Sequence, residues 1–270
     1  MHTLFSFISE PLSYPFMQRA MLIAIITGIV CAILSCYLVL KGWSLMGDAI
    51  SHAVLPGIVF AFLLGIPLAI GAFFSGIFCA LATGYLKNNS RVKEDTVMGI
   101  VFSGMFALGI VLFSQIDTDQ HLSHILFGNI LGITFTEFKQ TLWIACFIFL
   151  LVLLKYKDFI LYCFDPNYAK IIGLPIKLLH YSLLCLLALT IVASLQVVGV
   201  ILVIAMLIAP GVIAFILCHN SFNKMLIVAT LISVISSVLG TLISFYIDGA
   251  TGPCIIIIQA LFFIIALIIT

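Results

Sequence analysis

The stretch GDAISHAVLPG, residues 47–57, places a carboxylate and an imidazole four positions apart in an otherwise apolar part of the chain. On a helix, positions i, i+3 and i+4 share a face, so Asp48, Ser51 and His52 would point the same way. Pro56 has no N–H for the His52 carbonyl, which would leave a further oxygen at this level. Carboxylate oxygen and imidazole nitrogen together suit manganese, iron or zinc as divalent ions, whereas copper(I) would want sulfur ligands. The stretch therefore predicts a metal site with Asp48 and His52 as ligands, supported by Ser51 and Pro56.

The same pair also has two purely structural interpretations. Asp48 follows Gly47, so its carboxylate could cap the start of a helix, and an Asp–His pair can tie two helices together inside a membrane. Two ligands from one helix are too few for a tight metal site. A weak and incomplete set is nevertheless what a transit site needs, because the ion must leave again. Water, another helix or a second copy of the chain would supply the remaining ligands.

The elements that must position this pair are membrane helices. Of the 270 residues, 64% are hydrophobic and 8% are charged, whereas about a quarter of the residues in a soluble domain are charged. Apolar runs of about 20 residues, long enough to cross a bilayer, recur along the chain. The composition predicts an all-α, polytopic transmembrane helical bundle forming a single domain over residues 1–270. A net charge of +1 offers no basic surface for nucleic acid.

Nine spans are predicted, and eight to ten are compatible with the pattern. The apolar run at residues 178–218 is too long for one crossing, so we divide it at 196–199 into a tight helical hairpin. Residues 1–16 are expected to lie at the membrane interface. The segment 120–136 is too short and polar to cross and fits a re-entrant or interfacial turn. The predicted spans are residues 17–40, 48–65, 67–86, 96–114, 137–156, 179–196, 199–218, 225–246 and 254–270.

The basic residues predict the orientation, because loops rich in Lys and Arg stay in the cytoplasm. With nine spans, nine Lys and Arg residues fall on one side and only Arg19 and Lys139 on the other. The N-terminus is therefore expected outside and the C-terminus in the cytoplasm. The outer loops then carry acidic and His side chains that either concentrate cations or are ordinary solvated loop residues. The candidates for this external cation or partner face are Asp117, Asp119, His121 and His124.

Several stretches resemble one family of proteins. GDAISHAVLPG is similar to the corresponding stretch in the permease subunits of bacterial ATP-binding-cassette (ABC) importers for manganese, iron or zinc, the ABC-3 family. The resemblance covers nearly the whole chain and is closer to the manganese and iron branch than to the zinc branch. The other motifs that carry it are RVKEDTVMGIVFSGMFALGIVL (91–112), HILFGNILG (124–132), FDPNYAKIIGLPIKLLHY (164–181), SLQVVGVILVIAMLIAPG (194–211) and DGATGPCIIII (248–258).

The resemblance implies a type II ABC importer-like permease in the bacterial cytoplasmic (inner) membrane. Its expected partners are a second copy of the chain, two copies of a cytoplasmic ABC ATPase, membrane lipid, and an extracytoplasmic metal-binding lipoprotein or periplasmic protein. The sequence has no GxxxxGK[ST] motif, so this chain is not expected to be an enzyme, and ATP hydrolysis is expected on the separate subunit. No permanently bound cofactor is expected, since manganese, iron or zinc would be cargo.

The segment 157–178 is the expected cytoplasmic coupling loop. Asp165 and Pro166 are predicted to open a short helix, which Gly173 ends and Pro175 prevents from continuing. By the resemblance, this helix would receive the stroke of the ATPase; from its residues alone it would be an ordinary cytoplasmic turn. The candidates for the coupling contact are Asp165, Tyr168, Ala169, Ile172 and Gly173.

The function expected from these features is ATP-driven import of a divalent metal ion. Alternating access would move the ion from the external binding protein past Asp48 and His52 to the cytoplasm. The alternative is an ATP-independent secondary transporter or channel for divalent ions, with the pair as a proton relay. The ligand types do not separate manganese, iron and zinc, because all three accept them.

Overall fold

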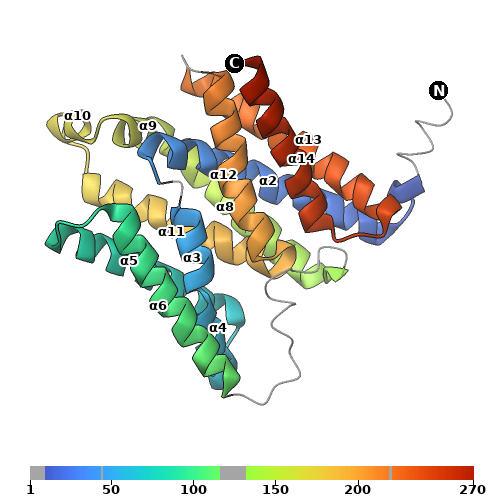
Figure 1. The fold of residues 1–270 in the computed structure, drawn as a ribbon, viewed down its shortest axis with the longest axis horizontal. Helices are drawn as coiled ribbons and strands as arrows, with labels where there is room; N and C mark the ends of the chain where they lie inside the picture. The colour runs from blue at the N-terminus through green and yellow to red at the C-terminus, as the bar shows by residue number, and fades with distance from the viewer. Residues whose placement is uncertain (1–9, 44, 116–131, 219–220) are drawn as a thin grey trace.

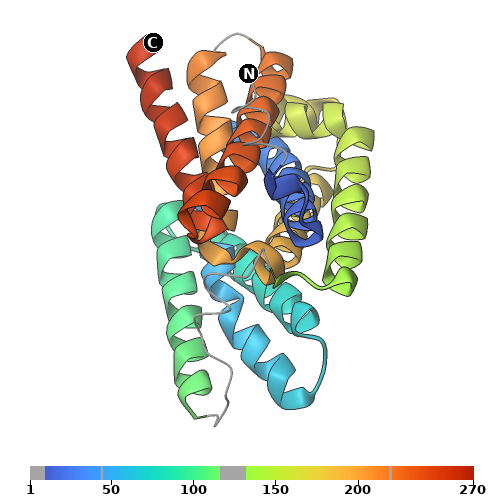
Figure 2. The ribbon, with the colours of Figure 1, turned by 90° about the vertical axis from the view of Figure 1, so that its right-hand side faces the viewer.

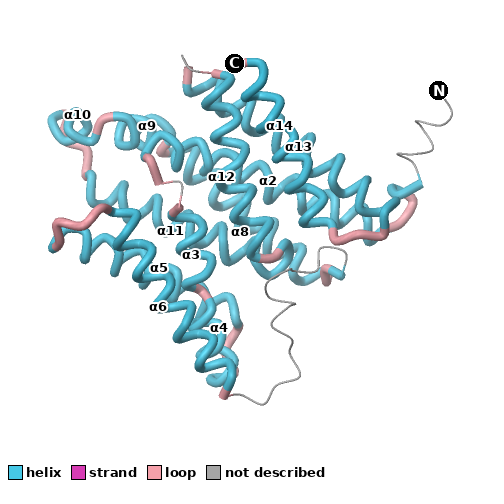
Figure 3. Tube along the Cα trace, in the orientation of Figure 1, coloured by secondary structure: helices cyan, strands magenta, loops and turns pink. Residues whose placement is uncertain are grey.

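The computed structural model describes residues 10–43, 45–115, 132–218 and 221–270, and all regular structure in these ranges is helical (Figures 1 and 3). Helices are expected in a membrane because they satisfy their backbone hydrogen bonds internally. In chain order, the helices are α2 (Pro15–Lys41), α3 (Met46–Ala53), α4 (Leu55–Leu64), α5 (Leu68–Asn89), α6 (Glu94–Ser114), α8 (Phe135–Leu154), α9 (Tyr156–Phe164), α10 (Pro166–Ile171), α11 (Ile176–Val198), α12 (Val200–Leu217), α13 (Phe222–Ile247) and α14 (Thr251–Ile269).

The predicted membrane bundle is confirmed. Within the described ranges, eight segments are long and apolar enough to cross a membrane, with α3 and α4 together counting as one. α12 adds a shorter apolar stretch, Leu202–Leu217, so each of the nine predicted spans has a helical counterpart. The predicted hairpin break is confirmed at Gly199, which lies between α11 and α12 and has a φ of +84°. Glycine adopts this backbone conformation without the steric cost that a side chain brings.

Helix α2 is the central element. It packs against α8, α9, α11, α12 and α13, and Figure 2 shows it between α8 and α13. Hydroxyl side chains hold the neighbours close. The Ser35 Oγ donates to the Ile208 carbonyl at 3.2 Å and accepts from the Gly211 N–H at 3.0 Å, while the Ser237 Oγ donates to the Ala24 carbonyl at 3.1 Å. Such interhelical hydrogen bonds stabilise the packing of helices in a membrane, because apolar side chains gain no hydrophobic free energy by moving from lipid to another helix.

The helices that carry the metal candidates form a second group beside this centre (Figure 1). α3 packs against α5, α6, α11 and α12, and α4 packs against α5 and α6. The predicted single span at 48–65 is divided here, because α3 ends at Ala53 and α4 begins at Leu55. The short helices α9 and α10 lie together at one end of the bundle, where they join α8 to α11 (Figure 1).

Candidate metal site

A tight turn delivers the chain from α2 into α3. Gly42 is left-handed with φ +72°, and the N–H groups of Gly42 and Trp43 both reach the Leu38 carbonyl at the end of α2. α3 then begins at Met46 after Leu45, the residue that occupies the N-cap position. Asp48 therefore lies in the first turn rather than at the cap, and the N-cap interpretation of Asp48 is wrong. In the first turn its carboxylate still interacts favourably with the positive, N-terminal end of the helix dipole.

Asp48 and His52 contact each other along one face of α3. The His52 Nε2 lies 3.3 Å from the Asp48 Oδ1, and the side chains are 28% and 31% exposed, respectively. This is the i, i+4 geometry that the sequence predicts. Ionisable groups in a membrane span are costly and usually mark an ion or substrate pathway.

Helix α6 holds the His52 ring in place. The ring stacks on Phe102, with centroids 6.1 Å apart and an interplanar angle of 25°, and meets Phe106 edge-on at 5.1 Å. The His52 Nδ1 is buried and has no hydrogen-bond partner among the described residues. A buried ring nitrogen without a partner is costly unless something else binds it. The imidazole is thus fixed by aromatic packing, with its Nε2 directed at the Asp48 carboxylate.

Ser51 and Pro56 support the pair through the backbone. The Ser51 hydroxyl is buried and donates to the Gly47 carbonyl at 2.7 Å, so it does not turn toward Asp48. Pro56 withholds its N–H as expected, and the helix breaks at Val54. The His52 carbonyl is not left free, however, because the Val54 N–H turns to it as well as to the Ile50 carbonyl.

Helix α5 braces the break in the span. The Ser75 hydroxyl donates to the carbonyl of Ala53, the last residue of α3, at 2.6 Å. Gly57 and Gly71 lie against each other where α4 crosses α5, and a Cβ on either one would collide with the carbonyl oxygen of the other. Only glycine permits so close an approach of two backbones. This crossing fixes α4 against α5 directly beyond the metal candidates.

One chain does not supply a complete metal site within the described ranges. No group of three or more His, Cys, Asp or Glu side chains there could hold an ion. Asp48 and His52 alone would be an incomplete set of ligands, and their role as metal ligands stays a prediction. The predicted external face of Asp117, Asp119, His121 and His124 lies outside the described residues, and it stays a prediction.

The short helix expected in the coupling loop is confirmed as α10. The Asp165 Oδ1 accepts from the backbone N–H groups of Asn167 and Tyr168, both at 3.0 Å, which makes Asp165 the N-cap of α10. Pro166 is the first helical residue, and Gly173 follows the helix with φ +89°. The chain resumes as α11 after Pro175.

The coupling candidates differ in what they can present to a partner. Tyr168 and Ile172 are 52% and 55% exposed, whereas Ala169 is fully buried and packs α10 onto the rest of the chain. Sequence reasoning missed Phe164 and Ile171, which are 78% and 81% exposed. The sequence feature that could have identified these two residues is a large apolar side chain within a short polar loop. An exposed apolar surface of this kind is typical of a protein contact.

A cluster of side chains connects the coupling segment to the turn before the metal pair. The Tyr162 hydroxyl of α9 lies 2.9 Å from the His180 Nδ1 of α11, and the Lys41 Nζ lies 4.1 Å from the centroid of the Tyr162 ring. His180 also meets Trp43 edge-on at 5.1 Å. Burial raises the pKa of Tyr162, so its hydroxyl stays protonated. The side chains of the cluster are in continuous contact from α9 through α11 to the α2–α3 turn, which directly precedes the helix of Asp48 and His52.

Together, the bundle and the pair define a multi-pass helical membrane protein with two ionisable side chains in contact at a broken span. Comparison with known proteins gives the family: the model of the ABC 3 transport family matches residues 13–270, and the chain belongs to this family. The family membership inferred from GDAISHAVLPG and the other motifs is thereby confirmed.

Three relatives illustrate the match. The chelated iron transport system membrane protein YfeD of Yersinia pestis is 81% identical over 99% of this chain and 90% of its own length. The manganese transport system membrane protein MntB of Synechocystis is 52% identical over 96% of this chain and 84% of its own. The solved structure of PsaBC from Streptococcus pneumoniae in complex with Fab is 40% identical, with a TM-score of 0.87, over 97% of this chain and 95% of that one. The fold is therefore that of an ABC permease.

Proposed function

We propose that this permease imports divalent manganese or iron, and accepts zinc, through a path that passes Asp48 and His52. The observation that carries the proposal is the contact at the broken span between the Asp48 carboxylate and the His52 imidazole, whose Oδ1 and Nε2 atoms lie 3.3 Å apart. Oxygen and nitrogen donors suit these three metals. The relatives named for chelated iron and manganese transport support the same class of cargo.

The chemistry of the pair favours binding that is brief. The His52 Nε2 and the Asp48 Oδ1 lie 3.3 Å apart, so one cation can bind the imidazole nitrogen and a carboxylate oxygen together. The carboxylate oxygens offer the second donor. We propose a homodimer in which a second copy brings its own pair toward the two-fold axis. Four protein donors from two chains, completed by water, would hold the ion without trapping it.

The proposed motor is a cytoplasmic ABC ATPase in two copies, which docks on α10. Exposed Tyr168, Ile171 and Ile172 offer it an apolar surface, and Asp165 holds that surface in shape. An external metal-binding lipoprotein or periplasmic protein would deliver the ion at the opposite end. In this orientation, the basic loops and the C-terminus face the cytoplasm and the N-terminus faces outward, in agreement with the distribution of Lys and Arg.

Uptake into reconstituted vesicles tests the proposal. Vesicles that contain the permease, its ATPase and ATP should accumulate radiolabelled manganese, and Asp48→Ala and His52→Ala should lose this uptake while still assembling with the ATPase. The uptake of radiolabelled zinc, measured in the same vesicles, shows which of the two metals the permease transports faster. Uptake that persists without the ATPase would support the secondary transporter instead, and unchanged uptake in both variants would remove the pair from the path.

A further inference from the structure

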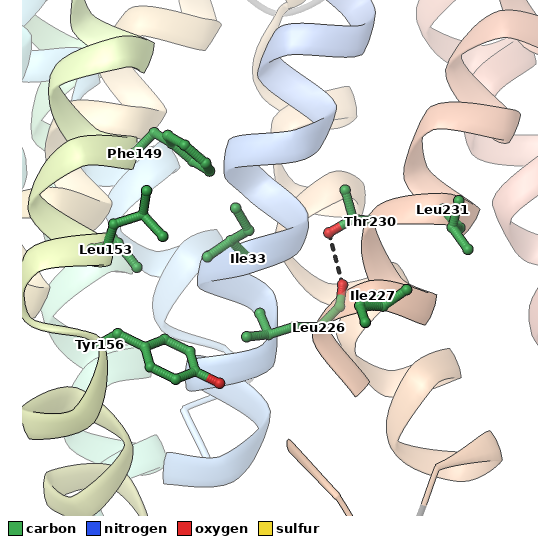
Figure 4. Close-up of a pocket in the computed structure, with 9 residues that line it drawn as sticks. Ile33, Phe149, Leu153, Tyr156, Leu226, Ile227, Thr230 and Leu231 are labelled. Carbon is green, nitrogen blue, oxygen red and sulfur yellow. Dashed lines mark hydrogen bonds between the residues drawn. The ribbon is translucent and has the colours of Figure 1, made fainter. Parts of the chain in front are cut away.

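An apolar groove opens between α8 and α13, with α2 as its floor (Figure 4). Its volume is about 310 Å³. Figure 4 shows Ile33 of α2 between the α8 side chains on one side and the α13 side chains on the other. None of the lining residues belongs to α3, the helix that carries Asp48 and His52. It is lined by Ile33, Phe149, Val152, Leu153, Tyr156, Leu226, Ile227, Thr230 and Leu231.

The interior of the groove suits a hydrocarbon chain, and one end of it is polar. The Thr230 hydroxyl is turned into its own helix, where it donates to the Leu226 carbonyl at 2.7 Å. Tyr156 lies at the end of the groove (Figure 4), and its hydroxyl donates to the Asn223 Oδ1 at the start of α13. Along α8, the lining residues from Phe149 to Leu153 span a helical rise of roughly 6 Å, about a fifth of the hydrocarbon core of a bilayer.

Three lysines lie close in sequence to the residues at this polar end. Lys155 and Lys157 flank Tyr156 in the chain, and Lys224 lies one and two turns before the lining residues Ile227 and Leu231 on the same face of α13. All three are exposed. Asp158 is the acidic neighbour, and its Oδ2 lies 3.0 Å from the Lys155 Nζ. Three positive charges and one negative charge leave a net of +2 on these four residues.

We propose that this groove binds an anionic phospholipid, with one acyl chain along α8 and α13 and the phosphate against Lys155, Lys157 and Lys224. The groove lies between helices that are long and apolar enough to cross a membrane, and the acyl chain of a lipid is the occupant that we propose for it. An acyl chain gains little by leaving other lipid for a surface that is equally apolar. Selectivity must therefore come from the headgroup, and a cluster of lysines at the membrane surface attracts a negative one.

Such a lipid would hold together the junction that carries the coupling segment. Tyr156 is the first residue of α9, and its contact with Asn223 ties α9 to the start of α13. Phe222 beside it packs on Tyr37 of α2 with ring centroids 5.1 Å apart. A headgroup bound across Lys157 and Lys224 would bridge α9 and α13 once more. Binding of the lipid does not depend on the identity of the transported metal.

Photolabelling with lipids of two headgroups tests the proposal. The full chain is placed in phosphatidylcholine nanodiscs that contain a trace of phosphatidylglycerol or phosphatidylcholine with a photoreactive group on the acyl chain, and labelled peptides are identified by mass spectrometry. Phosphatidylglycerol should label peptides covering residues 149–156 and 226–231 at least about fivefold more than phosphatidylcholine. A lysine at the membrane surface contributes roughly fivefold, so K157Q/K224Q should abolish the preference.

Matched variants separate the groove from general attraction to basic loops. K170Q/K177Q removes two lysines elsewhere in the same loop system and should leave the preference intact. Thr230→Trp fills the groove and should reduce labelling of both peptides by either lipid, with thermal unfolding as the check that the variant is folded. Equal labelling by the two lipids, or a phosphatidylglycerol preference that survives K157Q/K224Q, would overturn the proposal.

Discussion

Replacing Gly71 by alanine tests how closely α4 and α5 must cross to hold the broken span. A Cβ at position 71 would lie 2.7 Å from the Ala61 Cβ and would collide with the Gly57 carbonyl oxygen. Carbon atoms pack at about 3.5–4.0 Å, so the helices have to separate by about 1 Å. Overpacking costs about 1–3 kcal/mol, and a backbone carbonyl cannot rotate away, which favours the upper end. Alanine returns about 1 kcal/mol as helix propensity, so the expected net loss is about 2 kcal/mol.

Gly84→Ala is the matched control on the same helix. Its nearest neighbour would be the His180 Nε2 at 3.9 Å, an ordinary contact, so only the helix-propensity gain of about 1 kcal/mol remains. The two variants should therefore differ by about 3 kcal/mol in unfolding free energy, measured by thermal or denaturant unfolding in detergent. Gly71→Ala should also reduce metal uptake, because Ser75 would be drawn away from the Ala53 carbonyl. Equal stability of the two variants would refute the close crossing.

Three further substitutions test the supports around the pair. Ser75→Ala leaves the Ala53 carbonyl without its 2.6 Å donor and should cost about 1–3 kcal/mol in thermal unfolding, whereas Ser75→Thr should retain most of the stability. Tyr162→Phe removes the bond to His180 and should lower the metal moved per ATP hydrolysed; an unchanged ratio would exclude this link from coupling. Asp165→Ala removes the α10 cap, with an expected cost of about 1 kcal/mol and weaker co-purification of the ATPase. Asp165→Asn should retain both the stability and the co-purification of the wild type. Equal co-purification of the ATPase by the wild type, Asp165→Ala and Asp165→Asn would argue against docking on α10.

The features that the sequence predicts correctly have local causes. Gly199 stands within an apolar run that is too long for one crossing, so it marks the hairpin. Asp165 and Gly173 set the two ends of α10 through side-chain capping and a left-handed backbone, which involve only near neighbours. The i, i+4 spacing of Asp48 and His52 likewise fixes their contact once the segment is a helix.

The features that the sequence does not predict depend on the relative positions of distant helices. Phe102 and Phe106 are ordinary apolar residues until α6 packs on α3 and brings their rings against His52. Pro56 indicates an interruption of the helix, but the position of the break at Val54 depends on which groups donate hydrogen bonds to the carbonyls near it. One of these donors is the Ser75 hydroxyl, which is 22 positions away from Ala53 in the sequence. The close crossing at Gly71 is likewise set by tertiary packing.

Metal uptake by Asp48→Asn is the most direct test of the path. Asparagine keeps the size of the side chain and an oxygen that can accept from the His52 Nε2, but it removes the negative charge that a divalent ion needs. In vesicles with the ATPase and ATP, we expect labelled manganese uptake to fall roughly tenfold or more, while the complex still assembles and unfolds at the wild-type temperature. Uptake at the wild-type rate would contradict a path in which Asp48 binds the ion.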